Sequence, residues 1–143
     1  MVVLVDTNVI IDYYCEREEF YKASKGVMTW CGEDGVNGYV AFHSLPNIWF
    51  ILRKSSGKIR REILLNICKV LTVAGADQGE VIKAIENSDF KDFEDCLQDR
   101  CAVSVAADYI VTRNVKDFTT AETKAITPKE FCDLMENARG NDF

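Results

Sequence analysis

Histidine and paired cysteine are scarce in this chain of 143 residues. There is one histidine, His43, and none of the six cysteines belongs to a Cys-x-x-Cys pair. Structural zinc sites are built from closely spaced cysteine and histidine ligands, so the sequence argues against such a site. We interpret the six cysteines as free thiols that act as small apolar residues.

Long hydrophobic runs are also missing. No apolar stretch approaches the roughly 20 residues that a membrane-spanning helix needs. The first residues carry no basic segment ahead of an apolar one, as a signal peptide would. We therefore expect no membrane partner and a cytoplasmic location. With 48% hydrophobic and 28% charged residues, the composition is that of one globular domain.

Positive charge is in deficit, and the formal net charge is −6. This balance argues against binding nucleic acid through overall charge alone. It does not exclude a nuclease, because carboxylates that hold metal ions are neutralised when the metals bind. Basic residues concentrate in "RKSSGKIRR", residues 53–61, which contains no acid. This stretch is either a solvated surface or a patch that contacts RNA phosphates, with Arg53 as a candidate substrate contact.

Strand-like and helix-like segments alternate along the chain. We predict strands at 2–5, 39–42, 70–73, 109–112 and 125–126, and helices at 8–14, 18–31, 44–54, 58–69, 77–87, 92–105 and from 128 onward. This alternation favours a single α/β domain in which helices cover both faces of a parallel sheet. We place the domain at residues 1–135 and expect a frayed tail at 136–143.

Asp6 directly follows Val2–Val5, an apolar run typical of a strand that is buried on both faces. An isolated charge is costly at such a place unless it is paired or bound to a cation. Asp6 therefore either caps the helix that follows or holds a ligand at the carboxyl end of the strand. In parallel α/β folds, ligands bind at that end.

A second acidic group lies near the start of the predicted helix 92–105. Asp92, Asp95 and Asp99 are spaced i, i+3 and i+7, which places them on one helical face. They form either a solvated acidic face or part of a site for Mg²⁺ or Mn²⁺, which prefer oxygen ligands. Asn114 and Asp117, after the fourth predicted strand, either form a turn or add further oxygen ligands.

Three segments carry a resemblance to a known family. "VVLVDTNVII", "DCLQDRCAVSVAADYIVTRNVKDF" and "AITPKEF", in this order, resemble the PIN-domain family over about residues 1–135. The resemblance implies a three-layer α/β/α sandwich with a central parallel sheet, and Mg²⁺- or Mn²⁺-dependent hydrolysis of RNA phosphodiester bonds. It also implies the toxin component of a bacterial toxin–antitoxin pair, with RNA as the substrate, an antitoxin protein as a possible partner, and a homodimer.

The resemblance assigns roles to individual residues. Asp6 matches the first acidic ligand of the family, Asp95 matches the acid that opens the helix before "AADYIVT", and Asn114 or Asp117 matches the last polar position. We therefore predict catalytic roles for Asp6, Asp95, Asn114 and Asp117. The predicted metal ligands are Asp6, Asp92, Glu94, Asp95 and Asp117.

One position departs from the family pattern. The second acid of the family is expected within "SLPNIWFILRK", where Asn47 stands. Asp92 or Glu94 could supply the missing charge, and helical spacing places Asp92 more nearly on the face of Asp95. The predicted substrate-binding residues are Thr7, Asn8, Ser44, Asn47, Arg53 and Arg113. Of these, Arg113 is expected to meet the scissile phosphate.

Other functions also fit parts of the sequence. The missing second acid is compatible with a PIN-like module that binds RNA or protein with weakened or no catalysis. A phosphoacceptor signalling domain would need an acidic pair after the first strand and a lysine after the last one. A phosphatase with an aspartate nucleophile would need an acid two residues after Asp6, where Asn8 stands.

Overall fold

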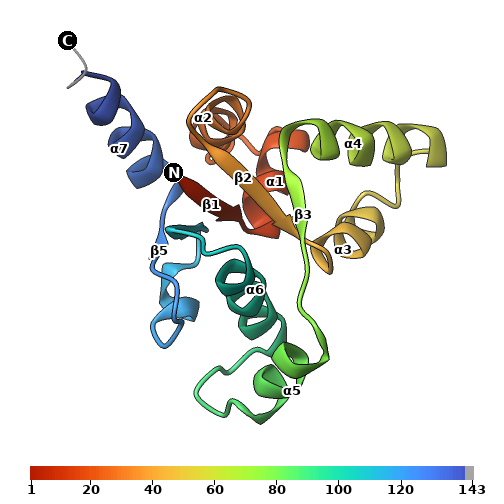
Figure 1. The fold of residues 1–143 in the computed structure, drawn as a ribbon. Helices are drawn as coiled ribbons and strands as arrows, with labels where there is room; N and C mark the ends of the chain where they lie inside the picture. The colour runs from red at the N-terminus through yellow and green to blue at the C-terminus, as the bar shows by residue number, and fades with distance from the viewer. Residues whose placement is uncertain (141–143) are drawn as a thin grey trace.

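The computed structural model describes residues 1–140, which form a five-stranded sheet and its covering helices (Figure 1). The strands are β1 (Val2–Val5), β2 (Asn37–Ala41), β3 (Thr72–Ala74), β4 (Tyr109–Val111) and β5 (Ala125–Ile126). The helices are α1 (Thr7–Tyr14), α2 (Tyr21–Cys31), α3 (Ser44–Ile51), α4 (Gly57–Val70), α5 (Gln78–Glu86), α6 (Phe93–Ser104), the 3-10 helix η1 (Val115–Phe118) and α7 (Pro128–Gly140).

The sheet is parallel throughout and has the strand order β3-β2-β1-β4-β5. Because the chain moves outward from β1 to β3 and then crosses back to β4, the strand order reverses between β1 and β4. Val5 pairs with Val111 across this junction, and the Asp6 amide donates a hydrogen bond to the Val111 carbonyl at 3.0 Å. A crevice is expected at the carboxyl ends of these two strands, since strand order reverses there.

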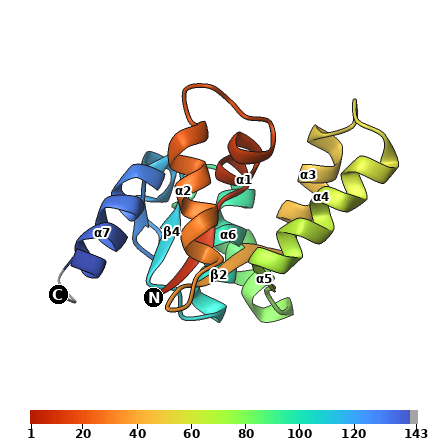
Figure 2. The same ribbon diagram turned by 90° about the horizontal axis from the view of Figure 1, so that it is seen from above.

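Helices cover both faces of the sheet, which explains why β1 shows no polar alternation. Val3 and Val5 pack into a core with residues of α1, α2, α3, α4 and α7. Leu4 and Ile110 point to the other face, where α5 and α6 complete a second core. Figures 1 and 2 show these helices on opposite sides of the strands. The predicted three-layer α/β/α sandwich is confirmed.

Short polar side chains start several of the helices, as the sequence suggests. The side chains of Asp6, Ser56, Asp77 and Asp92 accept backbone N–H groups at the starts of α1, α4, α5 and α6. Helix α3 differs from the prediction, because His43 occupies its N-cap position without a side-chain hydrogen bond. Ser44, predicted as this cap, is the first helical residue, and its hydroxyl bonds elsewhere.

Helices α3 and α4 form a hairpin, residues 44–70, which we call the α3–α4 arm. It projects from one side of the molecule, opposite α7 (Figure 2). Ile48 and Leu52 of α3, together with Ile67 and Leu71 of the α4 segment, anchor it to the core. The loop between the two helices forms the tip of the arm.

Helix α7 continues to Gly140, past the domain boundary predicted at residue 135. Arg139 donates to Glu33, and its guanidinium lies 4.4 Å from the centre of the Trp30 ring. These contacts connect the last turn of α7 to the region around α2, and residues 136–140 form the end of α7. The rest of the predicted tail, residues 141–143, lies outside the described residues. Within residues 1–140, no helix has the length and apolar character needed to cross a membrane.

Candidate active site

A cleft of about 230 Å³ lies at the carboxyl ends of β1 and β4. Carboxylates dominate its lining, and we call it the acidic cleft. Its residues are Asp6, Thr7, Asn8, Ile11, Arg17, Ile51, Asp92, Glu94, Asp95 and Asn114. The structure thus brings together seven of the predicted site residues from β1, α6 and the segment after β4, which are far apart in sequence.

Asp6 both caps α1 and faces the acidic cleft. One carboxylate oxygen accepts the Thr7 amide at 2.8 Å. The other accepts the Thr112 hydroxyl at 2.8 Å and the Asn8 side-chain amide at 3.3 Å. Burial raises the pKa of Asp6, and these hydrogen bonds from Thr112 and Thr7 oppose that rise. Asp6 therefore caps α1, as one alternative predicted, and it also lines the cleft in which the other alternative places a ligand.

Asp95 stands where several negative charges converge. Burial and the carboxylates of Asp92, Asp6, Asp117 and Glu94 raise its pKa to about 7. Asp117 does not line the acidic cleft, but its charge acts on Asp95 from η1. Such crowding disfavours a fully ionised cluster and is relieved when a cation is bound.

Glu94 is the carboxylate that meets Asn47. The Asn47 amide donates a hydrogen bond to Glu94 Oε1, and this bond opposes the rise in the Glu94 pKa that burial and Asp92 cause. Asp92, which helical spacing favoured for the missing charge, caps α6 by accepting the Asp95 amide at 3.1 Å. Both acids line the acidic cleft, but Glu94 is the one beside the position where the family's second acid was expected.

A hydroxyl–amide network supports the cleft from behind. The Thr7 hydroxyl donates to the Ser44 oxygen at 2.7 Å, and the Gln98 amide donates to the same oxygen at 2.8 Å. Ser44 is fully buried, so it orients Thr7 instead of contacting substrate as predicted. No local pattern points to Gln98, because its contact with Ser44 depends on the packing of α6 against the start of α3.

Asn8 and Asn114 mark the side of the cleft next to β4. Asn8 bridges two strands, because its amide donates to Asp6 and its carbonyl oxygen accepts the Arg113 backbone amide at 3.4 Å. Asn114 lines the cleft, and its backbone amide donates to the Thr112 hydroxyl at 3.0 Å. Both therefore present amide groups at the junction of β1 and β4.

Arg113 points to a different partner from the one expected. Its Nε donates to Asp12 at 2.6 Å, and its guanidinium lies 4.1 Å from the centre of the Phe20 ring. Arg113 lines a separate groove between α2 and α7 and not the acidic cleft. Its predicted role at the scissile phosphate finds no support in this placement.

Arg17 is the only lysine or arginine among the residues that line the acidic cleft. A single 3.4 Å contact links it to Asp12, whose shorter bond goes to Arg113, and 46% of the Arg17 side chain is exposed. Sequence pattern did not predict that Arg17 lines the cleft, because Arg17 stands among acids in "EREEF". Arg53, predicted to bind substrate, lies outside the cleft near the tip of the α3–α4 arm.

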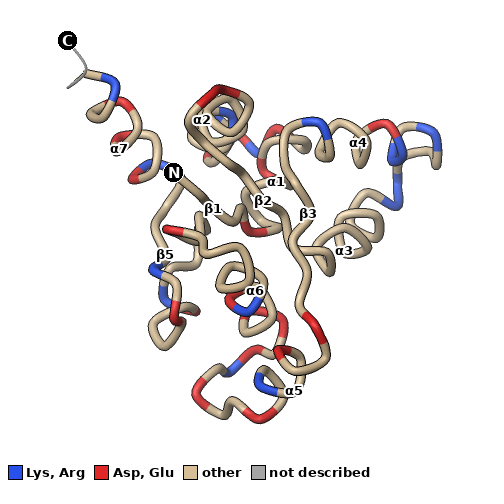
Figure 3. Tube along the Cα trace, viewed as in Figure 1, with Lys and Arg blue, Asp and Glu red and all other residues tan. Residues whose placement is uncertain are grey.

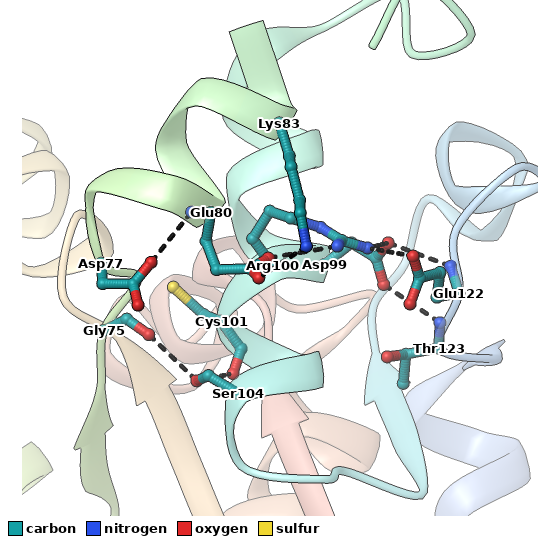
Figure 4. A network of polar contacts seen from close by, with 10 residues as sticks. All are labelled: Gly75, Asp77, Glu80, Lys83, Asp99, Arg100, Cys101, Ser104, Glu122 and Thr123. Atoms are coloured by element: carbon teal, nitrogen blue, oxygen red, sulfur yellow. Dashed lines mark hydrogen bonds and ion pairs between the residues drawn. The ribbon is translucent and has the colours of Figure 1, made fainter. Parts of the chain in front are cut away.

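Asp99 does not join Asp92 and Asp95, although the spacing predicted a common face. It is buried and accepts the backbone amides of Glu122 and Thr123, each at 3.0 Å, and it pairs with Arg100 at 3.2 Å (Figure 4). Its carboxylate therefore fixes the loop before β5. Asp99 therefore belongs neither to a solvated acidic face nor to the cleft, because the backbone of a distant loop donates hydrogen bonds to its carboxylate.

The donor set of the acidic cleft consists of oxygen atoms, which suits a hard divalent cation. Within residues 1–140, no three His, Cys, Asp or Glu side chains lie close enough to form a ready-made metal cage. A divalent cation that keeps several water ligands needs only one or two carboxylates from the protein. Asp6 and Asp95, with Glu94 beside them, are the residues present for that task.

Comparison with curated proteins gives one related ribonuclease. The chain is 27% identical over 135 residues to Ribonuclease VapC1 of Aquifex aeolicus, and the alignment covers 92% of this chain and 93% of that protein. The similarity therefore extends over nearly the whole length of both proteins.

Solved structures show the same fold at low sequence identity. VapBC-1 from nontypeable Haemophilus influenzae has a TM-score of 0.67 at 17% identity and covers 90% of this chain and 99% of its own. VapBC2 from Rickettsia felis, bound to a DNA fragment from its promoter, has a TM-score of 0.64 at 15% identity, with coverages of 89% and 98%. In addition, the sequence model of the PIN domain matches residues 2–116, most of the chain. The chain belongs to the PIN-domain family.

Proposed function

We propose that the protein is a ribonuclease that hydrolyses RNA phosphodiester bonds with Mg²⁺ or Mn²⁺ held by Asp6, Glu94 and Asp95. The observation that carries this proposal is the gathering of carboxylates in one cleft, where burial and the neighbouring charges raise the pKa of Asp95 to about 7. The full-length similarity to a protein named a ribonuclease supports the same activity. Asp92, Asp117 and Asn114 surround this group and complete it directly or through water.

A divalent ion in this cleft would supply a Lewis acid that activates water and offsets charge on the phosphate. Asp6 is held in one orientation by the Thr7 amide and the Thr112 hydroxyl, which suits a fixed ligand. Without the ion, Asp95 is partly protonated near neutral pH, because burial and the neighbouring carboxylates raise its pKa to about 7, so a bound cation would displace this proton. Arg17 is placed to donate hydrogen bonds to a phosphate oxygen from the same wall.

We further propose that the protein works as the toxin of a toxin–antitoxin pair and binds an antitoxin protein. The solved structures of similar fold support this, since several are of VapBC or FitAB assemblies. A homodimer remains our prediction for the toxin. Light scattering on the isolated protein, and on the protein co-expressed with its neighbouring small reading frame, measures both associations.

Cleavage of a fluorescent single-stranded RNA with Mg²⁺ or Mn²⁺ tests the activity. We expect wild type to cleave, and Asp6→Asn and Asp95→Asn to abolish cleavage while remaining folded. Asp34→Asn, at an exposed position in the loop before β2, serves as the control for loss of one carboxylate and should retain full activity. Activity that survives excess chelator would contradict the metal mechanism. Metal-loaded protein that binds RNA without cutting it would instead favour the binding-module hypothesis.

A further inference from the structure

Positive charge in this acidic protein gathers at the tip of the α3–α4 arm. Figure 3 shows the basic residues around the turn between these helices. No acid occurs from residue 53 to 61, although the whole chain carries a net charge of −6. We call this group the arm-tip patch; it consists of Arg53, Lys54, Lys58, Arg60 and Arg61.

Aromatic rings of α3 hold the arginines of the patch in place. The Arg60 guanidinium lies 3.9 Å from the centre of the Trp49 ring, and Arg61 approaches the same ring at 5.3 Å. Arg53 lies 4.4 Å from the centre of the exposed Phe50 ring. A guanidinium stacked on a ring keeps N–H groups along its edge available for phosphate oxygens. The patch is therefore partly ordered before any ligand binds.

The acidic cleft cannot attract a polyanion by its own charge. Four carboxylates line it, from Asp6, Asp92, Glu94 and Asp95, against the single cation of Arg17. Affinity of proteins for nucleic acid depends strongly on lysine and arginine contacts to phosphates. A long RNA therefore needs such contacts outside the cleft. The arm-tip patch can provide them, because it is a cluster of lysines and arginines and α3 runs from the cleft toward it.

Helix α3 connects the two places directly. Asn47 bonds to Glu94 at the edge of the cleft, and Ile51 lines the cleft. Arg53 follows Asn47 by six residues, which corresponds to about 9 Å of helical rise. A strand whose scissile phosphate lies in the cleft can therefore reach the patch within a few nucleotides.

We propose that the arm-tip patch binds the phosphate backbone of single-stranded RNA that flanks the cleaved bond. This inference rests on the proposed function of the acidic cleft and adds an RNA-docking surface to it. The patch supplies affinity with little sequence preference, because phosphate contacts position the strand without reading bases. Phe50 adds an exposed ring on which a base can stack.

Fluorescence anisotropy of a labelled oligouridine of about 20 nucleotides tests the proposal, in chelator and over a series of salt concentrations. The arm variant carries Lys54→Gln, Lys58→Gln and Arg61→Gln. The matched control carries Lys22→Gln, Lys25→Gln and Lys124→Gln, which lie outside the arm, and all six positions are exposed. Both variants change the net charge equally. A charge-conserving variant, with Lys54→Arg, Lys58→Arg and Arg61→Lys, separates lost charge from altered folding.

We expect the arm variant to bind at least tenfold more weakly than the control, and the slope of log affinity against log salt to fall by about 2 for the three lost charges. The charge-conserving variant should bind like wild type. Equal affinity and slope in the arm variant and the control would overturn the proposal, as would a wild type that does not bind the RNA. Polyglutamate that competes as well as RNA at equal charge would also overturn it, in favour of an acidic protein partner.

Chelator removes cleavage from this assay, so the two proposals fail separately. Binding that depends on the arm, in a protein that never cleaves RNA with metal, would refute the ribonuclease and leave the docking surface. Metal-dependent cleavage together with RNA binding that is unchanged in the arm variant would refute the docking surface and support the ribonuclease activity.

Discussion

The side-chain amide of Asn47 donates a hydrogen bond to the carboxylate of Glu94 and so joins α3 to α6 at the edge of the acidic cleft. The family pattern led us to expect an acid at position 47. The structure places the carboxylate of Glu94 beside that position, supplied from α6 instead of α3. Glu94 of α6 therefore gives this edge of the cleft the negative charge that position 47 of α3 does not provide.

This placement predicts that Glu94 contributes more to metal binding than Asp92 does. Glu94→Gln should weaken Mn²⁺ binding about tenfold or more, because a carboxylate about 4 Å from a cation contributes on the order of 1–4 kcal/mol. Asp92→Asn is the matched control; Asn still caps α6, and the Asp92 carboxylate is already engaged with the Asp95 amide. Titration calorimetry measures both affinities. A larger loss in Asp92→Asn than in Glu94→Gln would contradict the assignment.

Asn47→Glu should make the protein depend on metal for its stability. The variant replaces a hydrogen-bond donor to Glu94 with a second carboxylate, so we expect a loss of about 1 kcal/mol in chelator. Mn²⁺ should then raise the melting temperature more than it does in wild type, since an added carboxylate beside Asp6, Glu94 and Asp95 strengthens the attraction for a cation. Asn47→Ala, which only removes the hydrogen bond, controls for the first effect. An equal metal response in Asn47→Glu and wild type would mean that residue 47 points away from the ion.

Much of the fold and part of the site could be predicted from the sequence. The uninterrupted apolar run of β1 predicted burial on both faces, and the alternation of strands and helices predicted a parallel sheet. Asp6 and Asp95 could be placed because strand ends and helix starts of parallel α/β domains meet at one edge. These features depend on the local pattern of apolar and polar residues and on the order of strands and helices, and both can be read from the sequence.

The placements that could not be predicted depend on contacts between distant segments. Helical spacing put Asp99 with the site, but its carboxylate accepts hydrogen bonds from the backbone amides of Glu122 and Thr123. Ser44 looked like a helix cap, but α6 brings Gln98 to its hydroxyl. Arg113 was predicted to contact a phosphate, but α1 places Asp12 beside it. In each case, tertiary packing supplies a partner that no local sequence motif predicts.

The raised pKa of Asp95 predicts that the stability of the metal-free protein depends on pH. Its pKa is about 7 when folded and about 3.8 ordinarily. Between these values the folded state binds a proton that the unfolded state has lost, so the free energy of unfolding falls as pH rises from about 4 to 7 and then levels. Because Asp95 is partly exposed, we expect a fall of only about 1–2 kcal/mol.

Urea denaturation in chelator at about pH 5 and pH 8 measures this change. Asp95→Asn should remove much of this pH dependence. In the wild-type protein, Mg²⁺ added at pH 8 should restore the lost stability, since the cation replaces the proton. The raised pKa values of Asp6 and Glu94 act in the same direction, and the lowered pKa of His43, caused mainly by burial, acts in the opposite one, so a different dependence should remain in the variant. An equal change between these pH values in wild type and Asp95→Asn would refute the prediction.

Arg113 is expected to stabilise the fold. Asp12 is fully buried, and its 2.6 Å bond from Arg113 Nε is its shortest contact to a cation. Removal of one partner from a buried pair leaves an uncompensated charge, so Arg113→Ala should lower the free energy of unfolding by about 3 kcal/mol. Chemical denaturation measures the loss. The same experiment on Asp12→Asn with Arg113→Gln, which removes both charges, should show a smaller effect than Arg113→Ala.

Arg17 is expected to act on RNA and to matter little for stability. Its contact with Asp12 is 3.4 Å long and its side chain is 46% exposed, so Arg17→Ala should lower the free energy of unfolding by only about 1 kcal/mol or less. If Arg17 donates to a phosphate oxygen in the acidic cleft, the same change should lower kcat/KM for RNA at least tenfold. Arg17→Lys should recover part of this, because lysine keeps the charge without the two-pronged donor geometry. Steady-state cleavage and denaturation of both variants test the pair of effects. An Arg17→Ala protein with unchanged kcat/KM would show that the guanidinium serves Asp12 alone.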